Sequence, residues 1–186
     1  MLIAVYGLPR SGKTFLCNEV ENNLNSVGKR CKHLKPSKMI KDISVLYTFK
    51  LPCVPHDEQS RIIDNIYEQL RLAEQEYPTV ILDCHYAYPD KDKYKTPTPV
   101  YNQHFHEIYD KYYYMDTDVS LIMQRMKQTN GIKDNYDYTL NDLQRWKQFE
   151  ILDLTEILHN INKKLNLLSG NNPIDQLLEV LQGGNI

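Results

Sequence analysis

Eight residues near the start of the chain, GLPRSGKT at 7–14, constrain the fold more than any other segment. They follow an apolar run at 2–6, and Gly7 and Gly12 permit backbone angles that residues with a Cβ resist. A glycine-rich turn between a strand and a helix directs backbone N–H groups inward, and the helix adds its positive end. The pattern therefore predicts a buried strand, a phosphate-binding loop and a helix.

The residues of this loop have separate expected roles. Lys13 is expected to reach the β- and γ-phosphates of a nucleotide, and the Thr14 hydroxyl is expected to ligate Mg²⁺. ATP with Mg²⁺ is therefore the expected ligand. Arg10 either touches a phosphate or is solvated. The residues predicted to bind ATP phosphates are Gly7, Pro9, Arg10, Ser11, Gly12, Lys13 and Thr14.

Strands and helices are expected to alternate along the rest of the chain. The helical pattern also covers 38–47, and 84–99 and 127–138 are expected to be loops without regular structure. This alternation predicts an α/β fold in which helices cover both faces of a parallel sheet, within one domain of 186 residues. Strands are predicted at 2–6, 31–34, 79–83, 112–116 and 165–169, and helices at 13–27, 57–74, 118–126, 140–164 and 174–181.

Composition excludes several classes of protein. The net charge of −2 argues against non-specific nucleic-acid binding, since that activity needs a positive excess. No apolar run approaches the length of about 18 residues that a membrane span needs, and no signal peptide is expected. The four cysteines form no CxxC pair, and Cys31–His33 and Cys84–His85 lack the spacing of a zinc site. Reduced thiols in a cytoplasmic protein are expected.

Two carboxylates follow apolar strands and compete for the metal site. Because the carboxyl ends of parallel strands meet at one edge, Asp83 is expected to hold Mg²⁺ or its waters together with Thr14. Asp116 is the alternative, although its position before a predicted helix favours a capping role. His85 either orients Asp83, touches an attacking water, contacts the substrate, or is a loop histidine without a role.

Three segments together resemble a known group: GLPRSGKT, ILDCHYAYPDKDKYKTP (81–97) and YYYMDTDVSLIMQRM (112–126). They are similar to P-loop kinases of the nucleoside-monophosphate kinase type, and within these to archaeal-type adenylate kinases and adenylate-kinase-like ATPases. Asp83-Cys84-His85 matches the Asp-x-His of those proteins, and Lys95-Thr96-Pro97 matches the Lys-Thr-Pro of the archaeal group.

The resemblance implies a three-layer P-loop NTPase fold with a five-stranded parallel sheet in the order 2-3-1-4-5. It also implies an acceptor-binding helical region near 36–75 and a short lid near 126–138. Asp57 and Arg61, with His85, would face the acceptor, and Arg125 would join Lys13 and Asp83 as a catalytic residue. The turn GNNP at 170–173 would hold the adenine base, which makes Gly170 and Asn171 nucleotide-binding residues.

The expected activity is ATP-dependent phosphoryl transfer to a nucleotide or a related small acceptor. The segment 125–138 offers Arg125, Lys127 and Lys133, whereas such lids usually carry several arginines. A second interpretation is therefore an ATPase that switches a protein or ribonucleoprotein partner. A third is a kinase for a nucleic-acid end or a metabolite.

Overall fold

A five-stranded parallel sheet forms the centre of the computed structural model, which describes residues 1–36, 38, 56–88, 97–99, 106–128 and 138–183. The strand order is β2-β3-β1-β6-β7, so the five strands in chain order run 2-3-1-4-5 and the predicted topology is confirmed. The strands are β1 (Leu2–Tyr6), β2 (Cys31–Leu34), β3 (Thr79–Asp83), β6 (Lys111–Met115) and β7 (Leu165–Leu168).

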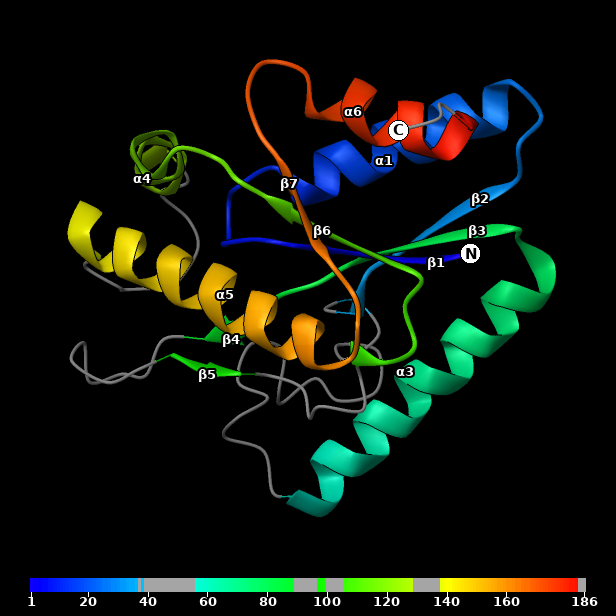
Figure 1. Cartoon of the computed structure of the whole chain (residues 1–186), viewed down its shortest axis with the longest axis horizontal. Helices are drawn as coiled ribbons and strands as arrows, with labels where there is room; N and C mark the ends of the chain where they lie inside the picture. Colours follow the sequence, from blue (N-terminus) through cyan, green and yellow to red (C-terminus); the bar gives the residue numbers. More distant parts are fainter. Residues whose placement is uncertain (37, 39–55, 89–96, 100–105, 129–137, 184–186) are drawn as a thin grey trace.

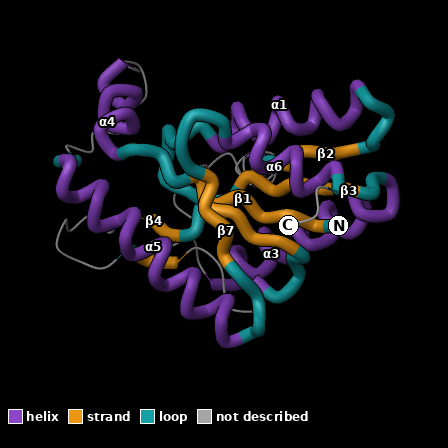
Figure 2. The backbone as a smooth tube through the Cα atoms, turned by 45° about the horizontal axis from the view of Figure 1, so that its top comes forward, coloured by secondary structure: helices purple, strands orange, loops and turns teal. Residues whose placement is uncertain are grey.

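Helices cover both faces of this sheet (Figures 1 and 2). One face is covered by α1 (Lys13–Ser26) and α6 (Pro173–Gln182), and the other by α3 (His56–Glu76) and α5 (Leu140–Asn160). The helix α4 (Val119–Gln128) packs beside α5. The three layers of the predicted fold are thus present, and none of the described helices is long and apolar enough to cross a membrane.

β1 is buried along its whole length because it has helices on both sides. Ile3 and Val5 pack in the cluster under α1 and α6, whereas Ala4 and Tyr6 pack in the cluster under α3 and α5. A central parallel strand is apolar at every position for this reason. The apolar run at 2–6 was the correct signal for such a strand.

The register of the sheet brings the functional loops to one edge. Val5 of β1 is paired with Asp83 of β3, and Tyr6 is paired with Tyr114 of β6. All five strands run in the same direction, so the segments that follow them emerge at the same edge. This carboxyl edge carries the 7–14 loop, Asp83, Asp116 and the turn after β7.

The structure corrects the predicted elements in three places. Residues 84–99 are not wholly irregular, because β4 (Ala87–Tyr88) pairs antiparallel with β5 (Thr98–Pro99). The long helix ends at Asn160, because Asn162 has a left-handed φ of 55° and the Lys163 N–H closes onto Leu158 O. The first residues of the predicted lid, 126–128, belong to α4. The predicted helix at 38–47 lies outside the described residues, except for Lys38.

A fully buried carboxyl group joins three of these elements. Glu150 of α5 accepts hydrogen bonds from Trp146 Nε1 at 3.1 Å, Tyr114 Oη at 2.8 Å and the Ala87 backbone N–H at 3.1 Å. Burial raises the pKa of Glu150 to about 7, although its hydrogen bonds and the nearby Lys13 oppose that rise. Sequence reasoning overlooked Glu150, which lies one helical turn after the buried Trp146.

Glu150→Gln is expected to change how the stability of the protein depends on pH. Because the folded-state pKa is raised from 4.5 to about 7, the contribution of this group to stability is fully present below pH 4.5 and is lost as pH rises through 7. The loss is on the order of 3 kcal/mol. Chemical unfolding at pH 5 and pH 8 should show a smaller decline for Glu150→Gln than for the native protein. The exposed Glu156→Gln on the same helix is the control, and equal declines in both variants would contradict the prediction.

Candidate active site

The 7–14 loop turns tightly between β1 and α1, and conformation favours glycine at both Gly7 and Gly12, while space also favours it at Gly7. Gly7 has φ 144° and Gly12 has φ 106°. A Cβ at Gly7 would lie 3.1 Å from the backbone oxygen of Met115 and 3.2 Å from its Cβ. Arg10 also has a left-handed φ, of 64°, and its side chain is exposed. The loop therefore has the strained backbone that a turn around an anion needs.

Lys13 lies across this loop. Its Nζ donates hydrogen bonds to Gly7 O at 2.6 Å and to Leu8 O at 2.9 Å, and the residue is 4% exposed. Burial lowers the pKa of Lys13, while the carboxylates of Asp83 and Glu150 act in the opposite direction. The site therefore holds an ammonium group in a largely desolvated position, where its charge acts strongly on a bound anion.

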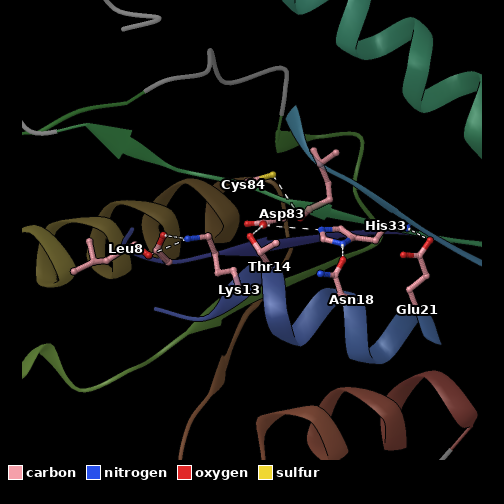
Figure 3. Close-up of polar contacts among 10 residues, drawn as sticks. Leu8, Lys13, Thr14, Asn18, Glu21, His33, Asp83 and Cys84 are labelled. Atoms are coloured by element: carbon pink, nitrogen blue, oxygen red, sulfur yellow. Dashed lines mark hydrogen bonds and ion pairs between the residues drawn. The ribbon is translucent and has the colours of Figure 1, made fainter. Parts of the chain in front are cut away.

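The Thr14 hydroxyl and the Asp83 carboxylate meet at the carboxyl edge of the sheet (Figure 3). Thr14 Oγ1 donates a hydrogen bond to Asp83 Oδ2, which joins the first turn of α1 to the end of β3. These are hard oxygen ligands of the kind that Mg²⁺ takes. In the described part of the chain, no group of three or more His, Cys, Asp or Glu residues could hold a metal. A site with few protein ligands fits Mg²⁺, which in phosphoryl-transfer sites is completed by phosphates and water.

Asp116, the other candidate acid, is engaged elsewhere. Its Oδ1 lies 2.5 Å from Nζ of Lys147 on α5. The interpretation of Asp116 as a helix cap is wrong, because Asp118 performs that role: its Oδ1 accepts the Ser120 backbone N–H at 2.7 Å. The ion pair partly neutralises Asp116, so Asp83 is the acid of the two that faces Thr14.

Arg125 reaches the loop from α4. Its Nη1 donates to Arg10 O at 3.0 Å and to Ser11 O at 2.9 Å. The Ser11 oxygen also accepts a hydrogen bond from the Thr117 hydroxyl at 2.8 Å. Loop carbonyls are thus held by an arginine and a threonine from the β6–α4 side. Arg125 and Lys13, predicted to act together, both donate hydrogen bonds to carbonyl groups of this loop.

The predicted acceptor residues are not brought together to the same extent. The ring of His85 hydrogen-bonds to the Gly7 backbone, and burial together with the nearby Lys13 lowers its pKa well below the usual value. His85 therefore lies beside the loop as a neutral imidazole at pH 7. Arg61 is exposed on α3. Asp57 lies in the first turn of α3, and its side chain is outside the described part of the structure.

The predicted base-binding turn, which contains Gly170 and Asn171, follows β7 at the same edge. Gly170 has φ 81°, and both residues are exposed. The turn is held by two reciprocal bonds, in which Ser169 N–H donates to Gln176 Oε1 at 3.3 Å and Gln176 Nε2 donates to Ser169 O at 2.7 Å. The structure therefore places an ordered, solvent-facing turn where the resemblance implies an adenine site.

Sequence reasoning missed a residue that lies next to Asp83. His33 of β2 is buried, and its Nε2 is 4.0 Å from Asp83 Oδ2 (Figure 3). From the sequence, His33 was assessed only as a zinc-ligand partner of Cys31. One signal was available in the sequence. His33 is the penultimate residue of the short strand β2, and functional groups gather where parallel strands end.

Comparison with known proteins supports the fold and leaves the family open. No known family model matches the sequence, and no curated protein matches it. The structure is similar to that of deoxyadenosine kinase from M. mycoides bound to dCMP and dCDP, with a TM-score of 0.56 and 12% identity over 98% of this chain and 99% of that chain. It is also similar to shikimate kinase from Acinetobacter baumannii in complex with shikimate. That match has a TM-score of 0.54 and 15% identity, over 100% of this chain and 94% of that chain.

These similarities establish the fold class. The chain has the three-layer α/β fold of P-loop kinases, with the predicted strand order and flanking helices. Neither of these two neighbours is an archaeal-type adenylate kinase, so the closer resemblance to that group stays a prediction.

Asp83→Asn is expected to raise the Mg²⁺ concentration needed for half-maximal ADP formation by roughly tenfold, because an amide keeps the shape of the side chain but loses the charge that favours a hard cation. Asp116→Asn is the matched control, since it breaks the ion pair with Lys147 and leaves Asp83 in place. Initial rates measured across a Mg²⁺ series provide the test. If Asp116→Asn shifts the series and Asp83→Asn does not, the metal-side acid has been assigned to the wrong strand.

Proposed function

We propose that the protein transfers the γ-phosphoryl group of ATP to a nucleotide or a related small acceptor. The observation that carries this proposal is the contact of the Thr14 hydroxyl with Asp83, at the edge of the sheet where Lys13 and Arg125 also meet the glycine loop. Phosphoryl transfer needs positioning and charge neutralisation more than covalent chemistry, and this constellation supplies both.

Each residue has a proposed task. The loop N–H groups and the start of α1 bind the phosphates, with Pro9, Arg10 and Ser11 forming the turn between Gly7 and Gly12. Lys13 and Arg125 neutralise charge on the group in transfer. Thr14 and Asp83 would hold Mg²⁺, which would offset the negative charge of the phosphates. Gly170 and Asn171 contact the base of ATP.

The acceptor is proposed to bind between α3 and the loop after β3. Arg61 would pair with an acceptor phosphate as a planar fork, and Asp57 and His85 would complete the contacts. The M. mycoides neighbour is a deoxyadenosine kinase with products dCMP and dCDP bound, which supports an acceptor that contains a nucleoside. The whole chain is proposed to be one cytoplasmic domain, with the acceptor region near 36–75 and the lid near 126–138.

A second candidate function is an ATPase that switches a protein or ribonucleoprotein partner. His85 favours it, because its neutral imidazole lies beside Lys13 and the loop, where it could accept a hydrogen bond from a water that attacks the γ-phosphate and so orient that water. In that case the released product is inorganic phosphate, and the acceptor site is not used.

Lys13→Ala is expected to lower turnover by roughly 10²–10³-fold or more, because it removes a preorganised positive charge from the transferring group. The fold should persist, since burial makes this ammonium group costly in the native state. ADP formation and far-ultraviolet circular dichroism should be measured together. The exposed Lys164→Ala is the control for loss of a surface lysine, and unchanged turnover in a folded Lys13→Ala protein would exclude the loop from the reaction.

Adding the correct acceptor is expected to accelerate ADP formation and to yield a phosphorylated product, whereas ATP alone is hydrolysed slowly because the site is incompletely shielded from water. Arg61→Ala should weaken this stimulation and spare ATP binding, and Arg71→Ala on the exposed side of the same helix should change neither. The measurement separates phosphorylated product from free phosphate across a panel of nucleoside monophosphates. Free phosphate alone, in all cases and with no effect of Arg61→Ala, would replace the kinase proposal by the ATPase.

A further inference from the structure

The proposed reaction leaves His33 without a task, although this histidine lies in the interior beside the metal-side acid. Its side chain is 1% exposed, and in the sheet it is paired with Ile81, two residues before Asp83. Its neighbours on that face are mainly apolar, including Cys31, Ile81 and Val20. Burying a polar ring among apolar residues costs stability unless its nitrogens are hydrogen-bonded, so the presence of His33 here needs an explanation.

His33 is fixed to α1 by two contacts. Its Nδ1 lies 2.9 Å from Asn18 Oδ1, and its backbone N–H donates to Glu21 Oε1 at 3.1 Å. Asn18 is four residues after Thr14, so both side chains lie on the same face of α1. The contacts therefore form a closed path from Thr14 to Asp83, then to His33, then to Asn18 and back along α1 (Figure 3).

The second ring nitrogen faces Asp83. Nε2 is buried, has no hydrogen-bond partner within the described residues, and lies 4.0 Å from Asp83 Oδ2. When the Asn18 amide is turned so that its NH₂ group faces Nδ1, it donates to that nitrogen and the neutral ring carries its proton on Nε2, toward Asp83. Hydrogen bonds of catalytic groups are often long in unliganded sites and shorten when the ligand binds.

We propose that His33 is a positioning residue that holds Asp83 Oδ2 against the Thr14 hydroxyl and so presents the other carboxylate oxygen to the metal. Thr14 donates to the same Oδ2, which leaves a hydroxyl lone pair for the metal as well. Among the described residues, no hydrogen bond or ion pair reaches Asp83 Oδ1. The inference rests on the proposed function, because it takes Asp83 as the residue that holds Mg²⁺.

Two substitutions of His33 distinguish the role of Nε2 from that of Nδ1. His33→Gln can place an amide N–H near the position of Nε2, whereas His33→Asn can reach the position of Nδ1 only. His159→Asn, at an exposed site in the last turn of α5, is the matched control. ATP binding to the full chain is measured by calorimetry, first with excess chelator and then across a Mg²⁺ series.

The Mg²⁺ concentration that gives half of the metal-induced gain in ATP affinity is expected to rise about 10-fold or more in His33→Asn, since removing a group that orients a metal ligand typically costs 10–100-fold. ATP affinity in chelator should stay unchanged, because the loop itself is intact. His33→Gln should stay within about threefold of the native value, as a rescue of the Nε2 contact. A merely structural role would alter ATP affinity in chelator as well.

Several results would overturn the inference. One is an unchanged Mg²⁺ response in folded His33→Asn, and another is a parallel loss of ATP affinity with and without metal. If His33→Asn fails to show cooperative unfolding, Asn18→Leu removes the support of Nδ1 without changing the ring, and an unchanged Mg²⁺ response there is equally decisive. If the ATP affinity of the native protein does not depend on Mg²⁺, both the proposed metal site and the role of His33 are rejected. If the native protein responds to Mg²⁺ and the response is unchanged in His33→Asn and Asn18→Leu, only the role of His33 is rejected.

Discussion

The close approach of Gly7 to Met115 is the constraint on which the rest of the site depends. A Cβ at Gly7 would lie 3.1 Å from the Met115 oxygen, a tight contact at the end of β6, and the positive φ of Gly7 turns the chain there. The Thr117 hydroxyl then holds the Ser11 carbonyl from the same side. Because the loop is short and packs against the end of β6, α1 begins close to the carboxyl ends of the strands. The Thr14 hydroxyl can therefore donate its hydrogen bond to Asp83.

Buried charge of both signs surrounds the loop, and its arrangement explains how the core tolerates it. Lys13 is desolvated, but carboxylates from two different layers, Asp83 and Glu150, raise its pKa against the effect of burial. Glu150 in turn accepts three hydrogen bonds, from α5, β6 and β4. Buried polar groups are tolerated when they are satisfied in this way, and they also fix how the elements that carry them meet.

The fold could be predicted from local patterns, whereas much of the site could not. Apolar runs, the 7–14 motif and helical periodicity each depend on neighbouring residues, so the parallel sheet and its two helical layers followed from them, whereas the strand order came from the family resemblance. Asp83 contacts His33, and Glu150 contacts Tyr114, although the residues of each pair lie far apart in the chain. Patterns of local spacing cannot predict such contacts. The sequence did contain one signal for Glu150, which interrupts the apolar stripe on α5 formed by Leu143, Trp146, Leu154 and Leu158.

Arg125 gives the loop a mechanical connection to the rest of the molecule. Its guanidinium joins α4 to two carbonyl groups of the loop, so displacement of α4 would strain or release the turn that surrounds the phosphates. Any ligand that favours one position of α4 must then change the affinity of the loop for its anion, and the anion must shift α4 by the same free energy. Together with the Thr117 hydroxyl, this side chain links the position of α4 to the conformation of the loop.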